Sequence, residues 1–229
     1  MKEFNTEIDD ISQKTQLLVE SVEQWYAANG IDPKANYEKG AAWINFSLGV
    51  DYYQSARKLL ADGNILGGGN VLRTSLENTA DIFFIVCEPS KIGRRSKAYV
   101  ESIEAYRDAM RQLGVEMLDK KGERPMQTIN SWTTASIHAR LQATGDSIVF
   151  VYDMFSYLSH PNPASMMFLT NEKFKNQMIN VFQQANEFNI LNTIAVTLNH
   201  SDIDTVKVEE CEAIANQLGT TITTPNRTE

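Results

Sequence analysis

The chain has 229 residues, of which 42% are hydrophobic and 22% are charged, so it can bury a full core and does not have the composition of a disordered protein. Its 21 basic and 29 acidic side chains give a formal net charge of −8, which argues against binding duplex DNA through a broad basic face. The sequence contains no apolar run near the ~20 residues that a membrane span needs, and it opens without a secretory signal.

Two cysteines are too few for a disulfide framework, and their spacing fits no zinc motif. We therefore expect a cytoplasmic protein in which Cys87 and Cys211 are both small core residues. The three histidines, His138, His160 and His200, have no ligand spacing between them. The sequence thus predicts neither a metal site nor a cofactor.

Apolar residues recur at helical spacing along nearly the whole chain, which predicts an all-α protein. A first helix is expected over residues 5–28, and a second from the Asp32-Pro33 pair to Gly63. We expect these two long helices to form a hairpin. A third helix, over residues 66–88, is apolar on most sides, which indicates that other helices surround it.

The second half of the chain continues the pattern after a fourth helix at residues 91–113 and an exposed polar loop at 114–130. Further helices are expected over residues 131–143, 147–160, 171–199 and 205–218. The resulting architecture is a single bundle of six to eight helices built on long antiparallel pairs. Its domain covers residues 1–219, and residues 220–229 form a flexible tail with too little apolar content to fold alone.

Arg73 and Glu77 stand one turn apart on the third helix, and the ~100° turn per residue places Arg73 in line with the apolar residues Ala80 and Phe84. Charged side chains are rarely buried unless they are paired. One interpretation is an ion pair that fixes helix packing. The other is an arginine that Glu77 holds so that its guanidinium faces an anionic ligand.

A second polar cluster lies near the end of the helix at 147–160. Asp153, Ser156 or Tyr157, and His160 follow at spacings that place them on one helix face, and Pro161 puts His160 at the carboxyl end. There the helix dipole favours the imidazolium form, which suits a general acid or a cationic anchor, although a structural capping role is equally compatible. Residues on one straight helix cannot form a serine-hydrolase triad.

Two weaker signals have structural and functional interpretations. The glycine triplet at residues 67–69 could expose amide groups to an anion, but close helix packing explains it better because no phosphate-loop motif surrounds it. The basic run at residues 91–97, with Arg107, Arg111, Tyr99 and Tyr106 nearby, could bind RNA, but such a run is usually a solvated helix face.

The Arg-x-x-x-Glu block at Arg73 to Glu77, together with the Ser-x-x-x-His-Pro-Asn block at Ser156 to Asn162, resembles an uncharacterised all-helical bacterial family. This similarity of pattern extends loosely over residues 35–200. More distantly, the chain is similar to the HEPN group, which implies a helical bundle and either a metal-independent ribonuclease of toxin or phage-defence systems or a non-catalytic partner. The HEPN signature has an arginine four to six residues before a histidine, and this chain departs from it.

The leading hypothesis is one polar pocket between helices that binds a small anionic or nucleotide-like ligand or holds a partner-binding conformation. The expected binding residues are Arg73, Glu77, Asp153, Ser156, Tyr157, His160 and Asn162. A first alternative is a HEPN-like ribonuclease, with His160 as general acid/base and Arg73 stabilising phosphorane charge, which requires these two residues to meet. A second alternative is a purely structural interaction protein, expected to be a homodimer through its long outer helices.

Overall fold

The computed structural model describes residues 2–116, 131–158, 170–200 and 205–222, and within these ranges it contains helices and no strand. The first four α-helices are α1 (Lys2–Asn29), α2 (Tyr37–Ala61), α3 (Ile65–Val86) and α4 (Ile92–Glu116). The others are α5 (Ile137–Leu141), α6 (Asp146–Leu158), α8 (Glu172–His200) and α9 (Thr205–Gln217). Short 3-10 turns span Pro89–Lys91 and Gln142–Thr144. The predicted all-α bundle is confirmed.

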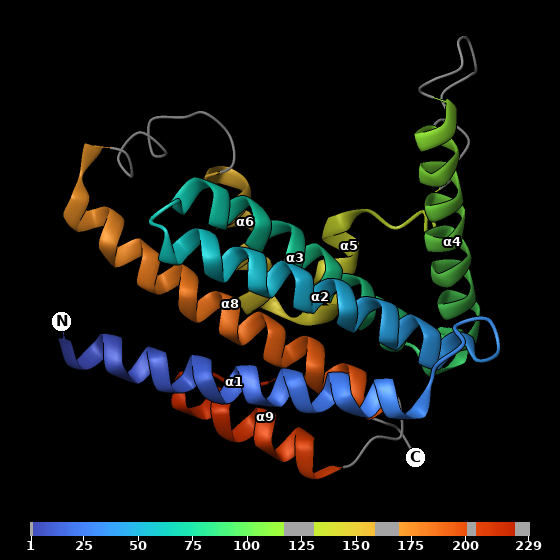
Figure 1. The fold of residues 1–229 in the computed structure, drawn as a ribbon, viewed down its shortest axis with the longest axis horizontal. Helices are drawn as coiled ribbons and strands as arrows, with labels where there is room; N and C mark the ends of the chain where they lie inside the picture. Colours follow the sequence, from blue (N-terminus) through green and yellow to red (C-terminus); the bar gives the residue numbers. More distant parts are fainter. Residues whose placement is uncertain (1, 117–130, 159–169, 201–204, 223–229) are drawn as a thin grey trace.

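The centre of the bundle is formed by α2, α3 and α8, each of which packs against the other two (Figure 1). The short helices α5 and α6 lie on α3, and α4 packs beside α2 and projects away from the bundle. The predicted hairpin of α1 with α2 is wrong in its main part, because α1 packs chiefly against α8 and α9. Contact with α2 is concentrated where Tyr26 meets Trp43 and Phe46, with ring centroids 4.5 and 5.7 Å apart.

The second helix begins later than predicted, at Tyr37. Asn36 is its N-cap, since its side chain accepts a hydrogen bond from the Lys39 amide at 3.1 Å. Asp32 instead closes the preceding turn by accepting from the Lys34 amide at 2.9 Å. The sequence offers two capping residues close together, and the structure uses the second one.

The glycine triplet serves close packing at the start of α3. Asn64 accepts a hydrogen bond from the Gly67 amide at 3.0 Å and so caps the helix. A Cβ atom on Gly68 would lie 2.6 Å from the Leu60 side chain, and one on Gly69 would lie 3.0 Å from Phe182. The glycines therefore allow α3 to approach α2 and α8, as the packing interpretation predicts.

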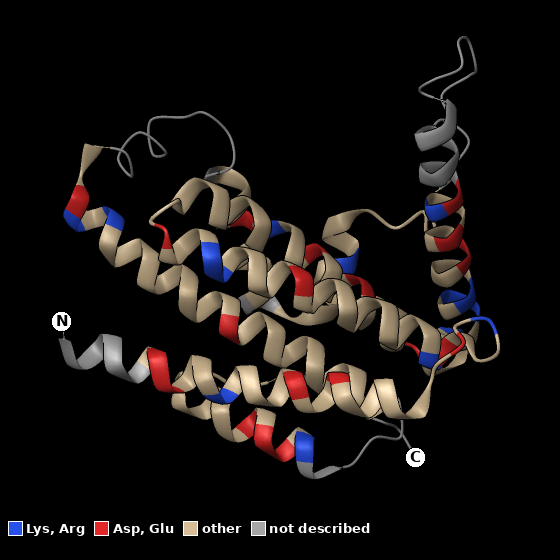
Figure 2. Ribbon diagram, viewed as in Figure 1, with Lys and Arg blue, Asp and Glu red and all other residues tan. Residues whose placement is uncertain are grey.

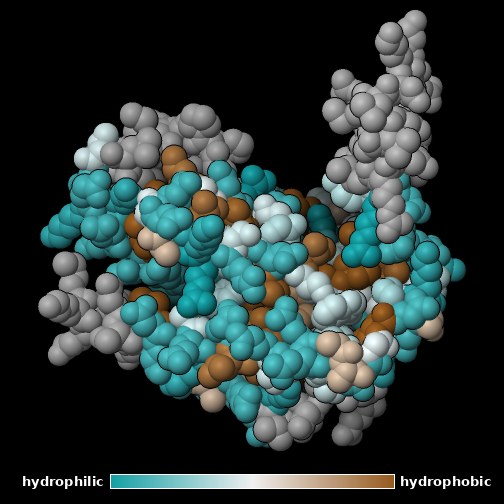
Figure 3. Space-filling model, in the orientation of Figure 1, coloured by the Kyte–Doolittle hydropathy of each residue, from teal (hydrophilic) through white to brown (hydrophobic). Residues whose placement is uncertain are grey.

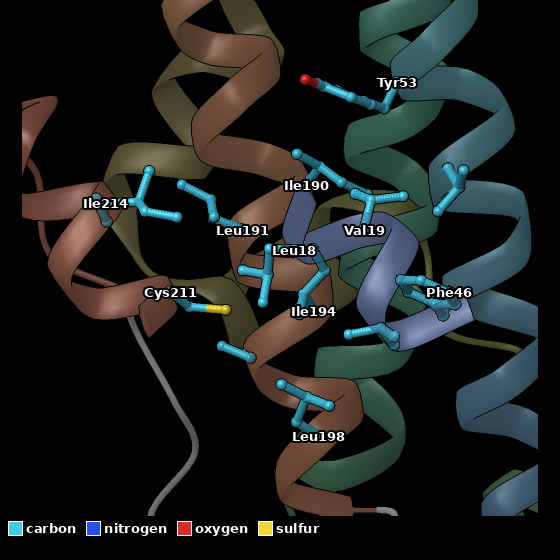
Figure 4. Close-up of a cluster of buried hydrophobic side chains, with 14 of the residues drawn as sticks. Leu18, Val19, Phe46, Tyr53, Ile190, Leu191, Ile194, Leu198, Cys211 and Ile214 are labelled. Atoms are coloured by element: carbon cyan, nitrogen blue, oxygen red, sulfur yellow. The ribbon is translucent and has the colours of Figure 1, made fainter. Parts of the chain in front are cut away.

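The largest hydrophobic cluster joins α1, α2, α8 and α9 (Figure 4). Cys211 is fully buried within it, as predicted, whereas Cys87 is exposed at the end of α3, which corrects the expectation that both cysteines are core residues. Ile222, within the segment expected to be a tail, is 8% exposed and belongs to this cluster. Residues 223–229 lie outside the described part of the chain.

Buried polar pairs connect the three central helices. Asn45 on α2 and Asn78 on α3 each donate from the side-chain amide to the other's backbone carbonyl, at 2.7 and 2.9 Å. Between α3 and α8, Thr79 shares a hydrogen bond of 2.8 Å with Thr193. One turn earlier on α3, the Ser75 hydroxyl accepts a hydrogen bond from the Asn189 side-chain amide, also at 2.8 Å. All these side chains are at most 6% exposed, so their hydrogen bonds replace those they would make with water.

Glu187 is a buried carboxylate in the middle of α8, with 3% of its surface exposed. The Tyr53 hydroxyl on α2 lies 2.9 and 3.1 Å from its two oxygens and donates to the carboxylate. Burial raises the pKa of Glu187, and the Tyr53 hydrogen bond and the charge of Arg57 offset this only in part. Ionisation of Glu187 therefore costs stability.

We expect the free energy of unfolding of the wild type, relative to that of Glu187→Gln, to rise as the pH falls from 7. A carboxyl group with a raised pKa in the folded state binds a proton more tightly there than in the unfolded chain. The difference should grow as the pH falls through the raised pKa and level off below the ordinary value of 4.5. Urea unfolding at several pH values measures it, with Glu172→Gln in the exposed first turn of α8 as control. A difference that does not depend on pH would contradict the prediction.

Candidate functional site

Three charged residues, Arg73, Glu77 and Asp81, follow at four-residue spacing on the edge of α3 that faces α5 and α6. The opposite side of α3 packs on α2 and α8, so this edge is where its polar side chains can reach the surface. Partners for them come from α5 and α6. We call these residues and their partners Tyr152 and Arg140 the three-helix cluster.

Tyr152 on α6 connects Arg73 to Glu77. The Arg73 guanidinium donates to the Tyr152 hydroxyl at 3.3 Å, and this hydroxyl donates to the Glu77 carboxylate at 3.0 Å. Arg73 and Glu77 also form a direct ion pair of 3.4 Å, with side chains 33% and 36% exposed. The Tyr152 ring is buried, and the guanidinium carbon lies 5.5 Å from its centroid, within the range of a cation–π interaction.

The hydrogen bond with Tyr152 is the main reason why the pKa of Arg73 is raised. Burial opposes this shift, and the Glu77 carboxylate supports it. Arg73 is therefore held as a cation in a fixed orientation, half-exposed at the junction of α3 and α6.

Arg140 on α5 pairs with Asp81 on α3, and this is the more buried ion pair, with side chains 18% and 16% exposed. Burial lowers the pKa of Arg140, while Glu77 and Tyr152 favour its charged form. Because the pKa of a guanidinium group lies far above neutral pH, Arg140 stays charged. Both arginines of the cluster therefore act electrostatically on the same two residues, Glu77 and Tyr152.

His138 and Asp153 form an exposed pair at the outer edge of the cluster. Their closest side-chain atoms are 3.4 Å apart, with 63% and 57% of the side chains exposed. The His138 ring also stands edge-on to Tyr152, with centroids 6.0 Å apart at 88°. This pair marks where the cluster meets the exposed face of α6.

The structure brings some of the predicted residues together and separates others. Arg73 and Glu77 are adjacent, but Tyr152, and not Tyr157, joins them, while Asp153 pairs with His138. Tyr157 is 60% exposed on the outer side of α6. The Ser156 hydroxyl is buried, and it has no hydrogen-bond partner among the described residues. His160 and Asn162 lie outside the described residues, so a meeting of Arg73 with His160 stays a prediction.

Sequence reasoning missed Tyr152, Asp81, Arg140 and His138 as members of the site. One signal for Tyr152 was present, because Ile148, Tyr152 and Phe155 recur at helical spacing and are all at most 3% exposed. That stripe identifies the inner face of α6, and a tyrosine hydroxyl on such a face needs a polar partner.

Three of the four basic side chains in the run of residues 91–97 pair with neighbouring carboxylates, and Figure 2 shows basic and acidic residues close together along this part of the chain. Arg95 and Lys91 both contact Glu88, and Lys97 lies 3.8 Å from Glu101. Arg95 is also part of the fold, since it donates to the Phe84 carbonyl at 2.6 Å and covers the Phe84 ring. Tyr99 is buried. This pairing supports the structural interpretation of the run over RNA binding.

No group of three histidine, cysteine, aspartate or glutamate side chains within the described ranges is arranged to hold a metal ion. Among the helices that the structure describes, none has both the length and the apolar character needed to cross a bilayer. Comparison of the chain with family models, curated proteins and solved structures finds no match.

Proposed function

We propose that this protein is a non-catalytic interaction protein that binds a second copy of itself through the outer face of α6. The α6 face consists of Phe150, Asp153 and Tyr157. In this proposal the three-helix cluster has a positioning role, because it fixes α5 and α6 on α3 and so presents that face. This corresponds to the hypothesis of a polar cluster that holds a partner-binding conformation.

The observation that carries the proposal is the exposure of two large aromatic side chains on one face. Phe150 is 70% exposed and Tyr157 is 60% exposed, and their seven-residue spacing places both on the same side of α6. On the face drawn in Figure 3, by contrast, hydrophilic side chains cover most of the surface and hydrophobic ones show in small areas between them. Aromatic residues are enriched in protein interfaces and among the residues that dominate binding energy.

A second copy is the partner that best fits the charges of this face. Asp153 carries a negative charge, and His138 beside it becomes positive when it binds a proton. In a two-fold symmetric dimer the same patch meets itself, so Asp153 of one copy can face His138 of the other. The face then matches its own image in both apolar and charged groups.

The charges within the three-helix cluster also favour a positioning role. Glu77 and Asp81 are each paired with an arginine, so the cluster balances its own charges and does not present a surplus of positive charge. An anion-binding alternative has one supporting observation: Arg73 and Arg140 each have a terminal nitrogen without a hydrogen bond to the described residues. The ribonuclease alternative depends on His160, and it stays a prediction.

Light scattering after gel filtration and sedimentation velocity over a concentration series test the proposal. We expect the wild type to form a dimer, and Phe150→Asp to raise the dimer dissociation constant by about 30-fold or more, as loss of a hot-spot aromatic does. Leu17→Asp, on α1, changes a side chain of similar exposure (59%) and should leave the dimer intact. Circular dichroism of both variants checks the fold.

A wild type that stays monomeric at the highest concentration, or equal weakening by both substitutions, would rule out the α6 face as the dimer interface. Titration of the wild type with inorganic phosphate separates the alternative role. Phosphate that shifts the NMR signals of the Arg73 and Arg140 guanidinium groups, without any effect on association, would favour anion binding.

A further inference from the structure

A cleft of about 810 Å³ opens between the start of α1, the end of α2 and the first half of α8. Figure 1 shows the first turns of α1 and α8 at the same end of the molecule. The cleft uses other helices than the three-helix cluster and shares none of its residues. Any ligand bound here would therefore occupy a site separate from the α6 face.

One wall of the cleft is a row of amide side chains on α8. The row consists of Asn176, Gln177, Asn180 and Gln183, whose spacing places them along one side of the helix. Between Lys175 and Glu187 the helix carries no charged residue (Figure 2). Within the described part of the chain, none of the four amides takes part in a side-chain hydrogen bond. Asn176 and Gln177 are exposed, and Asn180 and Gln183 are half-buried.

Apart from Asp9 and Lys173, apolar residues form the rest of the lining. Ile8 from α1 and Leu60 from α2 are 7% and 1% exposed, and Ile179 of α8 is half-buried between the amides. Gly63, which follows the end of α2, lines the cleft without a side chain of its own. The cleft thus combines an apolar floor with a neutral wall of carboxamide groups, each of which has both donors and an acceptor.

We propose that this cleft binds an extended peptide segment with apolar side chains at alternate positions. A carboxamide has one acceptor oxygen and two N–H donors, so it can satisfy both the N–H and the C=O group of a peptide unit. An extended chain offers these groups at regular intervals and directs alternate side chains to one face. The amide row would bind the backbone, and the apolar floor would receive the alternate side chains.

The dimensions and charges of the cleft agree with this ligand. From Lys173 to Gln183 the helix rises about 15 Å at 1.5 Å per residue, which equals four to five residues of extended chain at about 3.3 Å each. Lys173 and Asp9 bring one charge of each sign to the lining, so it favours neither an acidic nor a basic peptide. A nucleotide fits less well, because the lining contains one basic side chain and no aromatic ring for a base.

The test is a fluorescence-anisotropy screen of labelled, end-capped hexapeptides in which apolar residues alternate with varied ones, using the full chain. We expect saturable binding by part of the library, and about tenfold weaker binding by Asn180→Leu, which keeps the side-chain size but loses the amide. Gln54→Leu removes an exposed amide from α2 outside the cleft and should bind as the wild type does. Peptides methylated on the backbone nitrogens should bind at least tenfold more weakly.

Three results would overturn the proposal. The first is no binding by any peptide of the library. The second is binding that neither Asn180→Leu nor backbone methylation weakens, which would place the peptide elsewhere or make its side chains alone responsible. The third is a shift of the side-chain amide NMR signals of the row by ATP but not by the peptides, which would assign the cleft to nucleotides. Because Phe150→Asp lies outside the cleft, it should leave peptide affinity unchanged. The proposal for this cleft and the proposal for the α6 face can therefore be contradicted independently of each other.

Discussion

Asn78→Ala is expected to lower the free energy of unfolding by about 3 kcal/mol, because it removes buried hydrogen bonds and leaves a small cavity between α2 and α3. The Asn78 amide donates to the Asn45 carbonyl at 2.9 Å, and its oxygen lies 3.1 Å from the Asn45 amide. Alanine loses both interactions and leaves part of the Asn45 amide unpaired at a site with no exposure. Urea unfolding followed by circular dichroism measures the change.

Asn70→Ala is the matched control for this prediction. Asn70 is exposed two turns earlier on the same helix, so both substitutions change helix propensity alike. We expect the control to change the free energy of unfolding by less than about 0.5 kcal/mol. If both variants lose the same small amount, the paired amides do not stabilise the bundle.

Asp81→Ala is expected to cost about 2–4 kcal/mol, since it leaves the guanidinium of Arg140 largely buried without its carboxylate. The double variant Asp81→Leu/Arg140→Met, which replaces both charges with apolar groups, should be more stable than Asp81→Ala. A comparison of the two variants with the wild type by thermal and urea unfolding separates the cost of a stranded charge from the net value of the pair.

Lys97 and Glu101 provide the comparison for an exposed pair, with side chains 56% and 55% exposed. Glu101→Ala should change the free energy of unfolding by less than about 1 kcal/mol, because water and salt screen such pairs. If Asp81→Ala lowers the free energy of unfolding no more than Glu101→Ala does, the buried pair contributes no more to stability than the exposed one. The dimer dissociation constant of Asp81→Ala, compared with that of the wild type, tests whether the three-helix cluster positions the α6 face.

Helix positions could be predicted from the sequence because they depend on local information. Apolar periodicity, capping residues and glycine stops placed the long helices within a few residues of α1, α3, α4 and α8. The partners of α1 could not be predicted this way, since its apolar face would fit α2 as well as α8 and α9. Which faces meet depends on residues far apart in the chain, and the pattern of one helix does not contain that information.

The same limit explains the candidate site. Arg73 and Glu77 could be found because a charged pair interrupts the apolar pattern of α3. Their link to Tyr152 depends on which side of α6 rests on α3, which only the packed structure determines. Arg140 and His138 sit on a helix of five residues, too short to show periodicity.

The buried hydroxyl and amide pairs between α3 and α8 have a consequence for how α8 can respond to a ligand. Thr79 with Thr193, and Ser75 with Asn189, match at two successive turns. A piston-like shift of α8 by one turn, about 5.4 Å, would break this match and leave polar groups stranded in the core. We therefore expect a ligand in the proposed cleft, at the other half of α8, to act locally or through bending of the first turns and not by sliding the helix.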